Sequence, residues 1–233
     1  LANGFSTGDG LYFINPSQLG VFSGYCEMDQ QSGGWTLLLS ADGNSTYWGN
    51  NSPNWKGAGS GDAPSSLQNT DHHSPAYSRL QTNNIMICYQ DADHCYVFEH
   101  SYDISLQHFF VNNVTYTAFT YQSYGYSNVG SSSILSDYEN AIGETVSRHS
   151  CQWLGINEQR SISSIGYLAD GNGGCSGSGY AYHDDAALGV GLQSCQDANS
   201  CDNGGSGHLA GRSRHVNGID ESGVLGPWFV FGK

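Results

Sequence analysis

The sequence predicts a loop-rich fold built from short β-strands, and three features of its composition indicate this. The chain of 233 residues contains 32 Gly and 5 Pro, so turns are expected to be frequent. Charged residues make up 12% of the chain, against roughly 25% in an average soluble domain, which leaves little material for long surface helices. Tyr, Thr, Ser and Asn are abundant, and they favour strands and polar loops over helix interiors.

Apolar periodicity divides the chain into strands and loops. Alternation in the first 40 residues predicts strands at about residues 11–14, 21–25 and 35–39. Residues 40–78 are rich in Gly, Asn, Ser and Pro, and we expect a long ordered loop, because Trp48 and Trp55 are costly to expose in a flexible tether. Further strands are expected at residues 84–89, 95–99, 109–121, 152–156 and 224–231, and a short helix at residues 136–146.

The length of the chain favours one large domain over residues 1–233 that can bury a real core. No stretch approaches the roughly 18 apolar residues of a membrane span. The chain begins at Leu1 with no charged or apolar leader ahead of it, so we interpret Leu1 as a processed end.

The charge balance excludes two classes of partner. Lys and Arg total 7 against 21 Asp and Glu, a formal net charge of -14. Such a surface repels phosphate backbones and anionic headgroups, so we expect no nucleic-acid partner and no membrane insertion. The carboxylates suit an oxygen-ligand cation such as Ca²⁺, although acidity also serves solubility alone.

The cysteines indicate an oxidising compartment. Seven are present and none forms a C-x-x-C pattern, so we expect a disulfide framework in a secreted, extracellular protein. Asn44, Asn50 and Asn113 head N-x-[ST] sequences, which agrees with secretion. The cysteines are Cys26, Cys88, Cys95, Cys151, Cys175, Cys195 and Cys201.

Two close pairs and an odd total bear on how these cysteines connect. Cys88 and Cys95, and likewise Cys195 and Cys201, could each close a tight local loop, although sequence leaves the connectivity open. Because seven is odd, at least one thiol is free or paired with another chain. We expect a disulfide-linked homodimer, since a symmetric bridge removes an exposed thiol.

Three linked motifs near the N-terminus carry a family resemblance. They are GDGLYF at residues 8–13, YCEM at residues 25–28 and GGWTL at residues 33–37. In this order and at this spacing they resemble the opening of fibrinogen-like domains, and within these the intelectins, or X-type lectins. The resemblance covers about residues 8–40 well, is thin through the middle, and returns loosely around residues 175–180.

The resemblance implies an α+β fibrinogen-like fold with short antiparallel strands, few helices and several disulfides. It also implies a Ca²⁺-dependent lectin whose bound ion coordinates vicinal hydroxyls of a sugar. One departure is that the family has a cysteine before the DGLYF-like run, whereas no cysteine precedes Cys26 in this sequence. Cys26 is therefore expected to pair elsewhere or to bridge to a partner chain.

Calcium and sugar ligands are expected in the glycine-rich region 165–220. Its first cluster places carboxylates, an amide and a histidine within sixteen residues, with glycines that can fold them around an ion. In the intelectins a Cys-x-Gly-x-Gly-Tyr-like stretch leads to an acidic ligand, so Asp184 or Asp185 is the first choice. The alternative is an ordinary polar loop with Asx-turns. Expected metal ligands in this cluster are Asp170, Asn172, Asp184 and Asp185, and expected sugar-binding residues are Tyr182, His183, Asp184, Asp185 and His208.

A second oxygen cluster lies next to the last two cysteines. Asp197, Asn199 and Asp202 alternate with other residues around Cys201 and predict either a structural calcium loop or a simple disulfide loop. Tyr182 is expected to stack on the sugar ring. His215, like His208, precedes the last strand and could line the same pocket.

The sequence argues against an enzyme. It has no H-E-x-x-H, no G-x-S-x-G elbow and no phosphate-cradling loop. Asp71 with His72 and His73 could suggest a triad or metal site, but a histidine pair in a polar loop is usually exposed. We therefore expect a binding protein for terminal galactose-type sugars. Alternatives are a lectin for exocyclic 1,2-diols, a fibrinogen-related protein-interaction module with structural calcium, and a secreted hydrolase, whose triad could assemble from remote positions.

Overall fold

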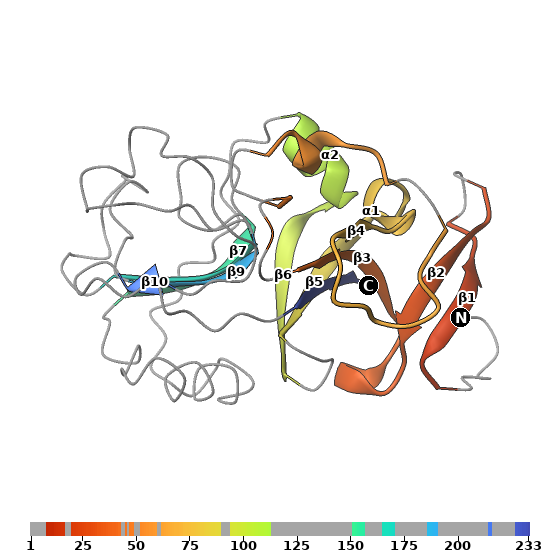
Figure 1. Cartoon of the computed structure of the whole chain (residues 1–233), viewed down its shortest axis with the longest axis horizontal. Helices are drawn as coiled ribbons and strands as arrows, with labels where there is room; N and C mark the ends of the chain where they lie inside the picture. Colours follow the sequence, from red (N-terminus) through yellow and green to blue (C-terminus); the bar gives the residue numbers. More distant parts are fainter. Residues whose placement is uncertain are drawn as a thin grey trace.

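The computed structural model shows a strand-dominated, antiparallel protein (Figure 1). Within the part of the chain that it describes there are only two short α-helices, which confirms the predicted loop-rich, strand-biased architecture. No helix among these residues is long and apolar enough to cross a membrane. The described residues are 8–16, 20–42, 45, 47–48, 52–59, 62–89, 94–112, 151–156, 165–170, 186–190, 214–215 and 227–233.

The larger sheet has seven strands in the order β1-β2-β3-β11-β5-β6, with β4 paired to β3. Its C-terminal strand β11 lies between β3 and β5 and is buried along its whole length. The last strand of the chain is therefore a central strand of the sheet that the first strands begin. The bounds are β1 Gly10–Ile14, β2 Phe22–Glu27, β3 Trp35–Ala41, β4 His72–His73, β5 Thr82–Tyr89, β6 His94–Ile104 and β11 Trp228–Gly232.

The three N-terminal motifs lie on three neighbouring strands. GDGLYF runs into β1, YCEM covers the end of β2, and GGWTL begins β3. β1 pairs with β2 in register from Gly10 opposite Cys26 to Ile14 opposite Phe22, and β2 continues onto β3 at Glu27 opposite Trp35. The strands expected from alternation in this region are confirmed.

The turn from β2 to β3 explains the paired glycines. It contains the 3₁₀ helix η1, Gln30–Ser32, and the next residue, Gly33, has φ +64°. A Cβ at Gly33 would lie 2.2 Å from the carbonyl oxygen of Met28, so only glycine fits there.

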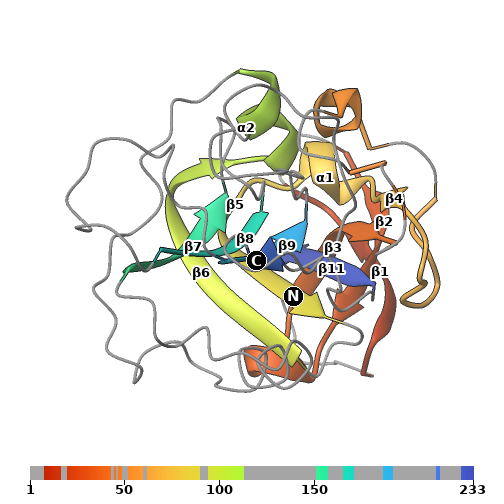
Figure 2. The same cartoon turned by 60° about the vertical axis from the view of Figure 1, so that its left-hand side comes forward.

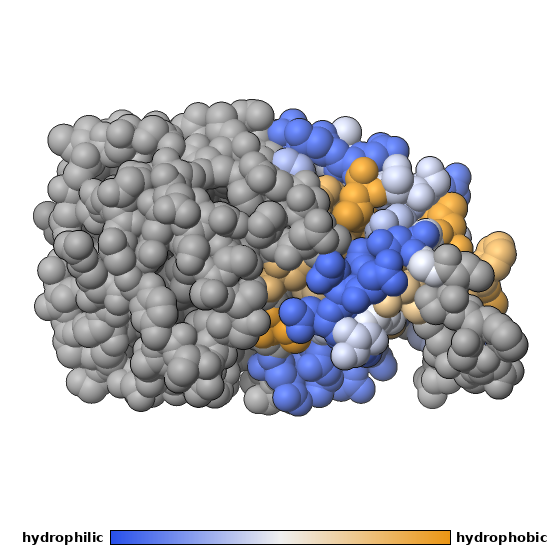
Figure 3. Space-filling model, turned by 90° about the horizontal axis from the view of Figure 1, so that it is seen from below, coloured by the Kyte–Doolittle hydropathy of each residue, from blue (hydrophilic) through white to orange (hydrophobic). Residues whose placement is uncertain are grey.

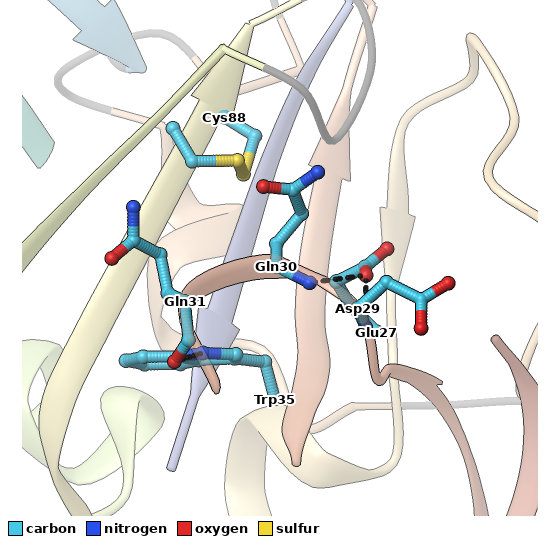
Figure 4. Close-up of a disulfide and its surroundings, with 7 residues drawn as sticks. Glu27, Asp29, Gln30, Gln31, Trp35 and Cys88 are labelled. Carbon is cyan, nitrogen blue, oxygen red and sulfur yellow. Dashed lines mark hydrogen bonds between the residues drawn. A yellow bond between two sulfur atoms is a disulfide. The ribbon is translucent and has the colours of Figure 1, made fainter. Parts of the chain in front are cut away.

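A buried disulfide joins β5 to β6. Cys88 and Cys95 face each other in the antiparallel register and are bonded, so one of the two local pairings that the sequence suggests is confirmed. Figure 4 shows the disulfide with Gln30, Gln31 and Trp35 around it. It belongs to one hydrophobic cluster, against which Leu67 also packs, made of Tyr25, Trp35, Leu37, Met86, Cys88, Cys95, Phe229 and Phe231.

Cys26 forms no disulfide. Its side chain is buried, and its sulfur lies 3.8 Å from the hydroxyl of Thr36. The expectation that Cys26 pairs elsewhere is therefore wrong for the described part of the chain, and burial of the thiol near the end of β2 argues against a bridge from it to a partner chain. Among the cysteines whose side chains the structure describes, Cys26 is the one without a disulfide.

The helices lie on the same side of the larger sheet in both Figures 1 and 2. α1, Ala76–Arg79, follows β4, and α2, Leu106–Val111, follows β6. Ser105 caps α2 by accepting a hydrogen bond from the backbone N–H of His108 at 3.2 Å. The strand expected from residue 109 onward is therefore wrong at residues 109–111, where Phe109 and Phe110 face the core from a helix.

The tryptophans of the long loop are packed, as expected. Trp48 and Trp55 are 0% and 2% exposed. Their ring centroids lie 4.8 Å apart, and Trp55 also packs 4.6 Å from Phe110 of α2. Trp55 belongs to the 3₁₀ helix η2, Pro53–Lys56, which Ser52 caps by accepting from the N–H of Asn54 at 3.2 Å.

The smaller sheet has four strands in the order β10-β9-β8-β7. The strand expected at residues 152–156 is confirmed as β7. The bounds are β7 Cys151–Ile156, β8 Ile165–Asp170, β9 Ala186–Val190 and β10 Arg214–His215. The helix expected at residues 136–146 lies outside the described residues.

Candidate functional site

Most of the expected calcium and sugar ligands lie outside the described residues. Asp170 and the strand residue His215 are the members whose backbone is placed. The expected residues outside the described part are Asn172, Tyr182, His183, Asp184, Asp185, Asp197, Asn199, Asp202 and His208.

The register of the smaller sheet brings distant parts of the chain to one end of it. Asp170 is the last residue of β8 and pairs with Cys151 of β7. In the next row Ala169 pairs with Ala186, the first residue of β9. Ala186 in turn pairs with His215 of β10. Asp170, Ala186 and His215 therefore lie at the same end of three adjacent strands.

This arrangement fixes where the chain leaves the smaller sheet and where it re-enters it, on either side of the first oxygen cluster. The chain leaves β8 at Asp170 and returns at Ala186, and these two residues sit one row apart. Asp184 and Asp185 directly precede Ala186 in the sequence. Asp170 and the first residue of β9, which follows the Asp184-Asp185 pair in sequence, therefore lie at the same end of the β8–β9 ladder.

The opposite end of this sheet faces the core. Ile165 of β8 pairs with Val190 of β9, and both are fully buried. In Figure 1 the arrowhead of β7 points toward β6, and β10 lies at the far side of the smaller sheet from the larger one. The end that carries Asp170 and His215 is therefore the outward one.

A second group of acidic residues lies at the turn between β2 and β3. Glu27 is 2% exposed, and its Oε1 accepts hydrogen bonds from the backbone N–H groups of Asp29 at 2.9 Å and Gln30 at 3.0 Å (Figure 4). Asp9 Oδ1 accepts from the N–H of Met28 at 2.7 Å. These carboxylates hold the turn together by accepting its unpaired N–H groups.

Burial and mutual repulsion shift the ionisation of this group. Burial raises the pKa of Glu27 above its ordinary value, the backbone N–H bonds oppose the rise, and the neighbouring Asp9 adds to it. Burial, with Asp9 and Glu27 nearby, raises the pKa of Tyr25 to about 12. Sequence reasoning did not assign a role to Glu27 or Asp9, although Asp is a residue type whose side chain commonly bonds backbone N–H groups at turns.

The Asp71-His72-His73 run does not converge on a catalytic or metal site. Asp71 accepts hydrogen bonds from the hydroxyl of Ser45 and, at 3.0 Å, from the N–H of Asp42. The ring nitrogens of His73 point instead to Tyr47 and to the backbone of Asn54. Because the carboxylate and the imidazole bind different partners, this run forms no Ser-His-Asp relay.

The expectation that this histidine pair is exposed is wrong. Both residues belong to β4, where Leu39 and Ser40 of β3 pair with them. His73 is 6% exposed, and burial lowers the pKa of both imidazoles below the ordinary value. Composition suggested a loop here, but pairing with β3 buries His73 and leaves His72 half-buried.

Among the described residues, no group of three or more His, Cys, Asp and Glu side chains is arranged to hold a metal ion. A comparison of the chain with protein-family models finds no match, and a comparison with curated proteins likewise finds none. The chemistry of the site must therefore be argued from its own residues.

Proposed function

We propose that this protein is a secreted, calcium-dependent lectin of the fibrinogen-like class that binds terminal galactose-type sugars. The observation that carries the proposal is the shared outward end of β8, β9 and β10, where Asp170, the entry to β9 and His215 meet. The fibrinogen-like assignment is supported by the three N-terminal motifs, which occupy the adjacent strands β1, β2 and β3.

The donor set at this end suits Ca²⁺. Calcium takes six to eight oxygen ligands and exchanges water readily, so a loop that supplies most of them leaves positions for a sugar diol. In this proposal Asp170, Asn172, Asp184 and Asp185 hold the ion. The two strands fix the separation of the loop ends before any ion binds, which reduces the ordering cost of binding.

The sugar would be held by groups beside the ion. Tyr182 is proposed to pack on the apolar face of the ring, and His183 and His208 to hydrogen-bond its hydroxyls. Asp197, Asn199 and Asp202 are proposed to hold a second, structural calcium ion. The mechanism is binding without turnover, with weak single sites and avidity from a homodimer.

The test is glycan capture with and without chelator. On a glycan array in calcium buffer we expect binding to galactose-terminated glycans that EDTA abolishes and free galactose blocks. Binding to glycans with exocyclic 1,2-diols instead would show that the protein recognises the alternative class of sugar. Capture unchanged by EDTA would refute the calcium mechanism, and turnover of a glycoside or ester would favour a hydrolase.

Two matched variants test whether Asp170 is a calcium ligand. Asp170→Asn removes a carboxylate at the proposed site, whereas Asp103→Asn removes an exposed carboxylate on β6. Calcium titration calorimetry should show at least tenfold weaker binding for D170N and wild-type binding for D103N. Equal effects of the two variants would mean that general acidity, and not this sheet end, attracts calcium.

A second candidate function is a protein-interaction module with purely structural calcium. It is favoured by the edge strand β1, where Leu11 and Phe13 are 49% and 85% exposed. On the face seen in Figure 3, hydrophobic side chains also interrupt the hydrophilic surface in several places. Calcium-dependent melting without any effect of sugar would support this candidate.

We also propose a homodimer, although the odd number of cysteines no longer supports it. Because Cys26 is buried and unpaired and Cys88 is bonded to Cys95, four cysteines are left, and their number no longer requires a bridge between chains. A non-reducing gel of the native protein decides between a covalent dimer and a monomer.

A further inference from the structure

The register of the smaller sheet also determines which of its residues share a face. In an antiparallel ladder, directly opposite residues lie on the same face, and so do residues two positions apart on one strand. Arg214 of β10 is opposite Ala187 of β9. Ala187 is in turn opposite Leu168 of β8, and Leu168 is opposite Trp153 of β7. Asp170 follows Leu168 by two positions on β8, so Asp170, Trp153 and Arg214 lie on one face.

The two faces of this sheet differ in charge. Ile165 lies an odd number of positions from Asp170 on β8 and therefore on the opposite face, where it pairs with Val190, and both are fully buried. Among the described residues of the four strands, Asp170 and Arg214 are the two that carry a formal charge. Both lie on the face away from the buried pair, as is typical of a sheet with only one face on the core. We call it the charged face.

A row of glycines leaves room on the charged face. Gly155, Gly166 and Gly189 are directly opposite one another on β7, β8 and β9. Gly166 lies two positions before Leu168 and so shares the face of Leu168. A glycine inside a strand often marks a place where a ligand or another backbone approaches closely, because no side chain stands above the sheet there. A ligand beside Trp153 and Arg214 can therefore lie close to the strands.

The spacing on the charged face suits a bridging ligand. Asp170 and Arg214 are two strands and two rows apart, about 12 Å between Cα atoms at ordinary strand spacing and rise. Trp153 is a diagonal neighbour of Asp170, which is opposite Cys151. Such neighbours lie about 7–8 Å apart, within reach of an aromatic side chain. A sugar held at Asp170 thus has an aromatic residue beside it and a cation farther along the same face.

The cation stands out because the chain is so acidic. Lys and Arg total 7 against 21 Asp and Glu. In the part of the chain around the larger sheet, the cationic groups of Lys233 and Arg79 lie over aromatic rings. Arg214 instead shares a face with the proposed calcium ligand Asp170. An acidic surface repels anions in general, so a ligand with a negative charge gains from this face in particular.

From this juxtaposition we propose that the charged face binds a galactose-type sugar that carries a sulfate ester. This ligand class rests on the proposed calcium-dependent lectin function. The ion at Asp170 holds the sugar hydroxyls, Trp153 packs beside the ring, and the planar guanidinium of Arg214 binds the sulfate oxygens. A carboxylate is itself a good calcium ligand, so an acidic sugar of that kind would not need Arg214. The arginine therefore favours sulfate over carboxylate.

The test is capture of matched glycans in calcium buffer. Galactose 6-sulfate leaves the vicinal 3- and 4-hydroxyls free for the ion, so glycans that end in it are compared with unsulfated and sialylated galactosides. We expect the sulfated glycan to bind at least about tenfold more tightly than the unsulfated one, the gain of a charge-assisted hydrogen bond. Equal affinity would overturn the proposal, and tighter binding of the sialylated glycan would overturn the assignment of sulfate.

Three arginine variants assign the preference. Arg214→Gln should bind the sulfated and unsulfated glycans equally while its calcium titration stays as in wild type, which also shows that the variant is folded. Arg79→Gln removes an exposed arginine from α1 and should keep the preference. Arg214→Lys keeps the charge but loses the planar fork, so its preference should be intermediate. A preference that survives in R214Q, or that R79Q loses equally, would overturn the role of Arg214.

Tryptophan emission gives a measurement on the wild-type protein. The chain has 5 Trp, and the four in the part around the larger sheet are at most 3% exposed. A saturating concentration of galactose 6-sulfate should therefore change the emission through Trp153, and Trp153→Phe should lose the change. Constant emission of the wild-type protein under saturation would overturn the placement of the sugar on this face.

The unsulfated glycan separates the ligand class from the function on which it rests. EDTA-sensitive capture of unsulfated galactose with no gain from sulfate would leave the lectin function intact and refute the sulfate ligand. Absence of EDTA-sensitive capture of every glycan in the set would refute both.

Discussion

Removing the β5–β6 disulfide should destabilise the protein strongly, and the loss can be worked from the structure. Cys88 and Cys95 are separated by 7 positions. Closing a loop of about eight residues removes about 2.5 kcal/mol of unfolded-chain entropy at 25 °C. Both sulfurs are also buried in the main hydrophobic cluster, and replacing them with methyl groups costs about 1 kcal/mol more. The double variant C88A/C95A should therefore lose about 3–4 kcal/mol.

The assay is urea unfolding followed by circular dichroism at pH 7.5. Cys26→Ala is the matched control, because Cys26 is buried but bonded only weakly to Thr36 and Gly24 through sulfur. Its loss should be about 1 kcal/mol. If C88A/C95A and C26A lose the same free energy of unfolding, the crosslink contributes nothing beyond packing and the entropic argument fails.

Two further changes test the turn between β2 and β3. Gly33→Ala should cost about 2–4 kcal/mol in urea unfolding, because its Cβ would meet the Met28 carbonyl and φ is positive. Gly20→Ala, with φ +75° and nothing within 4 Å, should cost only about 1 kcal/mol, and equal losses would contradict the clash. The stability of Glu27→Gln relative to wild type should rise as pH increases from 4.5, because the raised pKa of Glu27 makes this group ionise first in the unfolded chain, which lowers wild-type stability over that pH range. Urea unfolding midpoints of the two proteins measure this difference. A difference that does not change with pH, or an equal effect of Asp9→Asn alone, would contradict the prediction.

Sequence patterns predicted the strands of the larger sheet other than β4, because their apolar residues alternate or run together. The N-terminal motifs identified β1, β2 and β3, and the runs at β5 and β7 were equally plain. The pairing of Cys88 with Cys95 followed from their spacing, since two residues so close in sequence can face each other across a hairpin. Each of these features is local, and local patterns are what a single sequence reports.

The errors arose where tertiary contacts decide the outcome. Phe109 and Phe110 suit a strand by propensity, but the Ser105 cap and packing against Trp55 make the segment a helix. The histidine pair lies in a polar stretch, yet it pairs with β3, and His73 is buried there. Burial of Cys26 depends on Thr36 and the rest of the sheet, which counting cysteines cannot reveal.

The candidate calcium site follows from a combination of local and non-local information. The shift from apolar to oxygen-rich residues after Ala169 marks where β8 stops, and sequence alone shows it. The antiparallel register adds what sequence lacks, because it places the entry to β9 and the short strand β10 at the end where β8 stops. With Ile165 and Val190 buried at the other end, the ladder cannot slip by one residue without exposing its apolar positions. A one-residue insertion between Ala186 and Val190 would shift that register and should abolish calcium binding more completely than D170N, whereas an equal insertion in the chain after Asp103 should leave calcium binding intact.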